Sequence, residues 1–129
     1  ALGIVGGATF VARAFAGDVK HMKAVFAKAF KHNGFALIDV YQPCVTFNKV
    51  NTYDFFKEKT YKLEDEAHNP ADRAAAMVRA MDHERLAIGV FYEESRPTYE
   101  GMHPALVAGP LARQDISNVD LTKALEEFY

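Results

Sequence analysis

Hydrophobic and polar positions follow two different periods in the first third of the chain, and these predict a strand, a helix and a second strand. Residues 9–15 are rich in β-forming side chains and are bounded by glycines. Asp18 can cap the helix that follows. Residues 35–41 are nearly continuous in apolar residues, as expected for a strand covered on both faces. We therefore expect one βαβ unit with parallel strands and a right-handed crossover.

The predicted helix is amphipathic. Its apolar residues recur at helical spacing on one face, and its lysines take the opposite face. The apolar face is Val19, Met22, Val25, Phe26, Ala29 and Phe30, and the lysines are Lys20, Lys23, Lys28 and Lys31. His21 and His32 lie near the polar side and have no companions at the spacing of metal ligands, so we assign them no chemistry. Asn33 and Gly34 are a normal helix stop.

Further elements are predicted in the second half of the chain. Residues 53–59 suit a short helix, and residues 62–68 read as a charged, solvated connector whose consecutive carboxylates are poorly placed for paired acid–base chemistry. Asn69 followed by Pro70 predicts the start of another helix, with the proline at its first position. Residues 86–92 are the third strand.

The C-terminal part of the chain has a different character. Residues 98–118 contain prolines and glycines among scattered apolar residues, which predicts an extended arm, and residues 121–128 behind Asp120 suit a short terminal helix. We place the boundary between an α/β domain and this arm as 1–95 and 96–129. The arm cannot bury its own apolar side chains, so it should lie against another surface. These side chains are Met102, Leu106, Val107 and Leu111.

Composition narrows the classes of function. The chain has 129 residues, 50% hydrophobic and 25% charged, with a formal net charge of −2. This balance argues against a nucleic-acid or anionic-membrane surface, and no apolar run approaches the roughly 20 residues of a membrane span. The start at Ala1 reads as a truncation or processing point. A single cysteine cannot form an internal disulfide, which is compatible with a reducing cytoplasm.

That cysteine, Cys44, is the first candidate for chemistry. It follows Gln42 and Pro43 directly after the second strand. Because proline donates no backbone hydrogen bond, the strand should end there and present Cys44 at its carboxyl end, where open α/β sheets hold ligands. A thiol at this place is a candidate metal ligand or nucleophile. The alternative is ordinary packing, since free cysteine often behaves as a small buried hydrophobe.

Three stretches, GATFVAR (7–13), GFALIDV (34–40) and YQPCVTFNKVNTY (41–53), closely resemble the beta subunit of 2-oxoacid:ferredoxin oxidoreductases. The similarity covers the first half strongly and continues more weakly through AIGVFY (87–92) and RPTY (96–99). In that family the beta subunit binds thiamine diphosphate, and a cysteine in the matching position binds a four-iron four-sulfur cluster. The resemblance therefore implies that Cys44 is a cluster ligand, while the chain itself contributes no catalytic residue.

The chain also departs from the family pattern. It lacks the Gly-Asp-Gly stretch that holds magnesium with the thiamine diphosphate, the Asn-rich segment after it, and the other three cluster cysteines. The resemblance thus implies the C-terminal portion of such a subunit, with a partial thiamine diphosphate-binding-type α/β layer built on a parallel sheet. We expect this portion to be inactive and to bind no cofactor alone, because one cysteine is three short of a four-thiolate site.

Small polar residues follow Cys44. Thr46, Asn48 and Asn51 are candidates to support a cluster, because hydrogen bonds to the sulfurs and exclusion of solvent help to set its potential. The alternative for all three is turn and capping chemistry, in which Asn and Thr bond to nearby backbone. Thr52 can cap the helix expected at 53–59.

By resemblance, the intact complex oxidatively decarboxylates a 2-oxoacid to an acyl-coenzyme A and passes electrons to ferredoxin. Its implied partners are the alpha subunit and further subunits, ferredoxin, the 2-oxoacid and coenzyme A, in the cytoplasm. The lysine face of the first helix either docks an acidic partner such as ferredoxin or is a solvated surface. The competing class of function is a non-enzymatic α/β interaction module, in which Cys44 is packing and the arm is a docking device.

Overall fold

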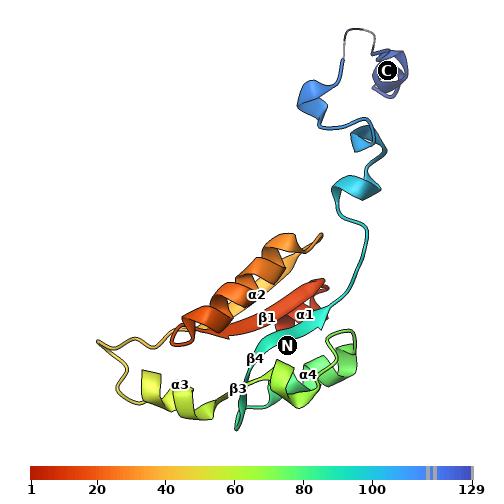
Figure 1. Cartoon of the computed structure of the whole chain (residues 1–129). Helices are drawn as coiled ribbons and strands as arrows, with labels where there is room; N and C mark the ends of the chain where they lie inside the picture. Colours follow the sequence, from red (N-terminus) through yellow and green to blue (C-terminus); the bar gives the residue numbers. More distant parts are fainter. Residues whose placement is uncertain (116, 118, 129) are drawn as a thin grey trace. The chain divides into compact units, whose positions relative to one another are not determined.

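A four-stranded sheet in the order β2-β1-β4-β3 forms the centre of the first part of the chain (Figure 1). The computed structural model describes residues 1–115, 117 and 119–128. The chain divides into two compact units, Ala1–Arg96 and Pro97–Tyr129, and each is described by itself. Among the described residues, no helix has both the length and the apolar character needed to cross a membrane.

The predicted βαβ unit is confirmed. Strand β1 (Phe10–Phe15) pairs in parallel with β2 (Ala36–Tyr41), and helix α2 (Val19–Lys31) connects them. Asp18 caps α2, because its carboxylate accepts a hydrogen bond of 3.0 Å from the backbone N–H of His21. This unit brings the carboxyl ends of β1 and β2 to the same edge of the sheet.

The other half of the sheet runs in the opposite direction. Strand β4 (Leu86–Glu93) pairs antiparallel with β1, and the short strand β3 (Thr60–Lys62) pairs in parallel with β4. The α/β class is confirmed, but the sheet is mixed where the sequence suggested a parallel one. The local pattern of β4 identifies a buried strand and contains no information on its direction.

Helices cover both faces of the sheet. Helix α2 packs on one face through Val25 against Phe10, Ala12 and Val90. Helices α1 (Leu2–Val5) and α4 (Arg73–Met81) cover the other face (Figure 1). Because successive side chains of a strand point to opposite faces, β1 contributes to both layers of core. The second cluster consists of Ile4, Ala8, Val11, Leu63, Ala76, Ala80, Ala87, Phe91 and Tyr92.

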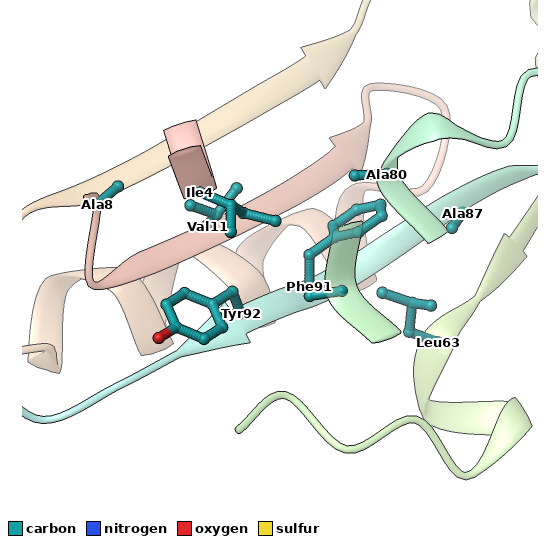
Figure 2. Close-up of a cluster of buried hydrophobic side chains, with 9 residues drawn as sticks. Ile4, Ala8, Val11, Leu63, Ala80, Ala87, Phe91 and Tyr92 are labelled. Carbon is teal, nitrogen blue, oxygen red and sulfur yellow. The ribbon is translucent and has the colours of Figure 1, made fainter. Parts of the chain in front are cut away.

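A β-bulge brings two large aromatic residues of β4 into the same core. Val11 pairs with Tyr92 and Ala12 with Val90, so Phe91 is the extra residue on β4. Phe91 and Tyr92 consequently both belong to the cluster around Ile4 (Figure 2). Simple alternation would have placed one of them on the α2 face.

Helix α4 begins later than the sequence suggested. The prediction that Asn69 and Pro70 start the helix was wrong, because Asp72 is the N-cap and its carboxylate accepts a 3.0 Å hydrogen bond from the N–H of Ala75. Asn69 instead forms a turn, in which its side chain accepts from the N–H of Ala71. Both residues are good caps, and the sequence alone did not decide between them.

The charged connector is also more structured than expected. It forms a 3₁₀ helix, Leu63–Glu66, and Leu63 is buried. Glu66 forms ion pairs with Arg79 and Arg85. The prediction of a solvated loop was therefore wrong here. The buried side chain of Leu63 and the ion pairs of Glu66 with Arg79 and Arg85 hold this segment against the rest of the domain.

The two histidines of the first helical segment lie away from its solvated face, which corrects their predicted place. The side chains of His21 and His32 are only 9% and 6% exposed. His32 Nε2 lies 2.8 Å from the hydroxyl of Thr9, which also accepts a hydrogen bond from the N–H of Phe35. His21 Nε2 lies 3.5 Å from a carboxylate oxygen of Glu64. His32 thus helps to join the end of α2 to Thr9, whereas neither ring nitrogen of His21 has a hydrogen-bond partner among the described residues.

Among its described residues, the second unit contains 3₁₀ helices at Glu100–Met102, Pro104–Leu106 and Leu111–Arg113, followed by helix α5 (Thr122–Glu126). Helix α5 lies within the predicted 121–128, and the Asp120 carboxylate accepts a 2.9 Å hydrogen bond from the N–H of Thr122. None of the described residues of this unit is buried. Its exposed apolar side chains are Tyr99, Met102, Val107, Leu111, Val119, Leu121, Leu125 and Phe128.

Candidate functional site

Cys44 lies in the loop of residues 42–52, which joins the carboxyl end of β2 to helix α3 (Tyr53–Lys59). Strand β2 ends at Tyr41, as the proline predicted. Pro43 is buried, whereas the thiol of Cys44 is free and exposed. The packing alternative for Cys44 therefore does not describe this chain, and the thiol is accessible for chemistry.

Aromatic contacts fix both ends of this loop on the sheet. The ring of Tyr41 stacks on Phe56 of α3, with centroids 4.8 Å apart and 25° between the planes. Phe15, at the end of β1, contacts Phe56 at 5.8 Å and Tyr53 at 5.9 Å. Such aromatic pairs stabilise a contact beyond simple burial. The loop is thus held at each end while its middle remains exposed.

The backbone around Cys44 favours the thiolate. Hydrogen bonds from the backbone N–H groups of Phe47 and Thr46 are the main causes that lower the pKa of Cys44, with a smaller contribution from that of Asn48. Hydrogen bonding to the charged form of a group stabilises that form. Since the thiolate is the form of cysteine that binds metal, this donor set fits an iron–sulfur ligand.

Asn48 organises the same loop. Its side-chain oxygen accepts hydrogen bonds of 2.9 Å from the N–H groups of Val50 and Asn51, and its own N–H donates to the Cys44 carbonyl at 3.0 Å. Thr52 caps α3 by accepting a hydrogen bond of 3.3 Å from Phe55 N–H, as predicted. The turn chemistry expected as an alternative is thus present at Asn48.

The three residues predicted to support a cluster surround Cys44 in sequence and differ in what they offer. Thr46 and Asn51 are exposed, and Asn48 is half-exposed. The backbone N–H of Thr46 is one of the groups that lower the pKa of Cys44, and the N–H of Asn51 donates to the side-chain oxygen of Asn48. Whether these residues surround a cluster stays a prediction.

The described part of the chain contains no group of three or more His, Cys, Asp and Glu side chains that could together hold a metal ion. A four-thiolate cluster at Cys44 would therefore take its remaining ligands from elsewhere. The loop also exposes apolar side chains, with Val45, Phe47 and Val50 exposed by 64%, 89% and 78%. Exposed apolar patches of this kind mark contact surfaces.

A pocket of about 620 Å³ lies beside the start of α3, at the carboxyl end of β1. Its lining includes Phe15, Tyr53, Asp18 and Lys62, and the last two form an ion pair of 2.9 Å. The hydrogen bond from Lys62 is the largest cause that lowers the pKa of Asp18. The sequence did not indicate this pocket, because its walls come from elements far apart along the chain.

The family model for the C-terminal part of the pyruvate ferredoxin oxidoreductase beta subunit matches residues 44–107, beginning at Cys44. The 2-oxoacid:ferredoxin oxidoreductase subunit beta of Saccharolobus solfataricus is 42% identical over 112 residues, covering 78% of this chain and 37% of that relative. The subunit beta of 2-oxoacid:ferredoxin oxidoreductase 1 from Aeropyrum pernix is 39% identical over 137 residues, covering 93% of this chain and 43% of that relative. The chain spans less than half the length of these curated relatives.

A solved structure is similar over almost the whole chain. A chain of the 2-oxoglutarate:ferredoxin oxidoreductase from Magnetococcus marinus, solved with 2-oxoglutarate, coenzyme A and succinyl-CoA bound, matches with a TM-score of 0.78 and 30% sequence identity. The match covers 98% of this chain and 42% of that one. Fold and sequence therefore agree on the same group of relatives.

Proposed function

Because this chain belongs to the family of 2-oxoacid:ferredoxin oxidoreductase beta subunits, we propose that it acts as the C-terminal portion of such a subunit. In the intact complex, the activity is the oxidative decarboxylation of a 2-oxoacid to an acyl-coenzyme A, with transfer of electrons to ferredoxin. The chain alone is inactive, since one thiol cannot complete a four-thiolate cluster. Its place of action is the cytoplasm.

The observation that carries this proposal is the setting of Cys44. The thiol is exposed at the carboxyl end of β2, and its pKa is lowered by the backbone N–H groups of Phe47 and Thr46. An exposed thiolate with directed N–H donors is suited to bind iron. We assign Cys44 as one ligand of a four-iron four-sulfur cluster, with Thr46, Asn48 and Asn51 around it.

Each part of the loop has a role in this assignment. When bound, thiamine diphosphate with magnesium supplies the carbon chemistry and the cluster accepts electrons. Hydrogen bonding by the backbone N–H groups of Phe47 and Thr46 lowers the pKa of Cys44 and so favours its charged form. The exposed side chains of Val45 and Phe47 can exclude water at a contact with the rest of the enzyme.

The proposed partners follow from the exposed surfaces of each unit. The second unit has no buried residue among those described and exposes a series of apolar side chains, including Met102 and Val107. A segment without a core of its own is stabilised by docking on another surface. We propose that this surface belongs to the multisubunit enzyme, whose alpha subunit, 2-oxoacid, coenzyme A and ferredoxin complete the system.

The test is Cys44→Ser in a full-length subunit assembled with its partners, followed by iron analysis and electron paramagnetic resonance of the reduced cluster. We expect loss of cluster iron and of ferredoxin reduction. Ala74→Ser is the control, because Ala74 is exposed on α4 and the change introduces the same serine outside the Cys44 loop. Unchanged iron and activity in Cys44→Ser would instead support a non-enzymatic interaction module. Activity of the isolated chain would contradict the proposed division of roles.

A further inference from the structure

Helix α2 has an unbalanced charge. Its sequence, VKHMKAVFAKAFK, contains lysines at 20, 23, 28 and 31 and no acidic residue. Some other basic side chains in this unit are paired with acids: Arg79 pairs with Glu66 at 3.2 Å, and Lys62 pairs with Asp18 at 2.9 Å. The lysines of α2 form no ion pair with any residue that the structure describes.

The four lysines lie on one side of the helix. Each is exposed, whereas Val25 is buried against the sheet. At about 100° per residue, positions 20, 23, 28 and 31 fall within less than half of the helix circumference. Their charges therefore add to a single positive surface, which can attract an acidic partner.

This surface also contains apolar area. Ala24 and Ala27 are exposed between the lysines. At the edge of the surface, Phe30 is 86% exposed and leans on Phe26, with ring centroids 6.5 Å apart. Aromatic side chains are enriched in protein interfaces, where a few residues contribute most of the binding energy.

The start of helix α2 lies at the same edge of the sheet as the candidate cluster site. Helix α2 starts directly after the carboxyl end of β1 and packs over β1 and β2 (Figure 1). The carboxyl ends of these parallel strands share one edge of the sheet, so the first turn of α2, with Lys20, lies at the edge where Cys44 follows β2. A partner bound at the first turn of α2 would therefore lie near the edge of the sheet where Cys44 follows β2.

We propose that the outer face of α2, made of Lys20, Lys23, Ala24, Ala27, Lys28, Phe30 and Lys31, is the docking surface for the acidic ferredoxin that accepts the electrons. The identity of the partner rests on the function proposed above. The chemistry of the surface requires a small protein whose acidic residues surround a flat or apolar contact area. The lysines speed the encounter, and Phe30 provides the apolar contact.

The first test is kinetic and uses the assembled complex. Lys23→Glu combined with Lys28→Glu reverses two charges near the middle of the helix length, one on each edge of the face. We expect the KM for ferredoxin to rise about tenfold or more at low salt, because steering by charge changes association rates by 10-fold to 1,000-fold. The kcat with methyl viologen, a cationic small-molecule acceptor, should stay unchanged. The difference in KM should shrink as salt is raised.

Lys59→Glu on α3 is the matched control for Lys28→Glu, because both change one exposed lysine by the same charge. Lys59→Glu should leave the KM for ferredoxin unchanged, and Phe30→Ala should raise it without changing its salt dependence. An unchanged KM in the double variant, or equal effects of Lys28→Glu and Lys59→Glu, would overturn the inference.

The second test does not depend on activity. The ¹⁵N-labelled 129-residue chain is titrated with ferredoxin at low salt, and the amide signals of α2 are followed by NMR. Shifts confined to α2 that disappear in the double variant would support the docking surface. Absence of a response in α2 would overturn it. If the α2 shifts occur but the wild-type complex reduces neither ferredoxin nor viologen, the docking surface stands and the proposed function fails.

Discussion

Tyr41 and Phe56 are stacked ring on ring, with centroids 4.8 Å apart, although fourteen residues separate them along the chain. Tyr41 ends β2 and Phe56 lies in α3, so this contact closes the loop that contains Cys44. The loop is short of internal apolar packing, since Val45, Phe47 and Val50 are exposed. Its conformation depends on the fixed ends and on the hydrogen bonds of Asn48.

Phe56→Ala should destabilise the first unit and release the Cys44 loop. Phe56 is half-buried and contacts the rings of Tyr41 and Phe15. We expect a loss of about 2 kcal/mol in the free energy of unfolding, less than for a fully buried phenylalanine. Urea unfolding measures the loss, and hydrogen exchange at the N–H of Asn48, which bonds to the Cys44 carbonyl, should become faster.

Phe30→Ala is the control for this change. Phe30 is 86% exposed, so its removal should alter the free energy of unfolding by less than about 0.5 kcal/mol. Equal losses in the two variants would show that the aromatic contacts around Phe56 do not hold the domain.

Gly89→Ala should destabilise β4 through the backbone. Gly89 has φ +118, a conformation that L side chains rarely adopt. An added Cβ would also lie 2.6 Å from the end of the Glu64 side chain, which can move away. We expect a loss of about 1–3 kcal/mol in urea unfolding, caused mainly by the backbone strain. Gly101→Ala, at an exposed position with more room, should cost much less, and an equal cost would contradict this explanation.

These effects show where sequence reasoning succeeds. The βαβ unit and the caps Asp18 and Thr52 were predicted because periodicity and capping are local properties. The antiparallel direction of β4 and its bulge at Phe91 depend on pairing with a strand about eighty residues earlier in the chain. Strand β3 has three residues, which is too short to leave a pattern.

The candidate site was predicted only in part, because only some of its features are local properties of the sequence. Pro43 indicated where β2 ends, and this placed Cys44 at the carboxyl end of the strand. The lowered pKa of the thiol depends on the backbone N–H groups of Phe47 and Thr46, and no residue type in the loop predicts this effect. Of the three polar candidates in the loop, Asn48 forms the side-chain hydrogen bonds, a choice that residue type alone did not indicate.

Asp18→Asn should lower the free energy of unfolding, and the size of this loss should depend on pH. Lys62 and then the backbone N–H of His21 lower the pKa of Asp18, so its charged form is favoured in the folded state. The resulting stabilisation is present above about pH 3.9, the pKa of an unfolded aspartate, and is lost as the pH falls through the lowered value. Asparagine retains the cap but loses the charge.

The difference in the free energy of unfolding between wild type and Asp18→Asn is measured by urea unfolding at pH values from 7 to 2. Because the pair with Lys62 is near the surface, we expect about 0.5 kcal/mol at neutral pH. The difference should be constant between pH 5 and pH 7 and shrink as the pH falls below about 3.9. A difference that stays the same from pH 7 to pH 2 would mean that the carboxylate charge is not its cause.

The thiol of Cys44 should titrate at lower pH in the folded chain than in the unfolded chain. In the folded state the N–H groups of Phe47 and Thr46 lower its pKa, and these donors lose their alignment in urea. The rate of alkylation by iodoacetamide, followed by intact mass against pH, should therefore show a native midpoint below that of an unfolded cysteine, about 8.5. Asn48→Ala removes the acceptor for the Val50 and Asn51 N–H groups and should move the midpoint toward the unfolded value. Asn51→Ala keeps that acceptor and should leave the alkylation midpoint unchanged. Identical midpoints in the native and the unfolded wild-type chain would rule out backbone stabilisation of the thiolate.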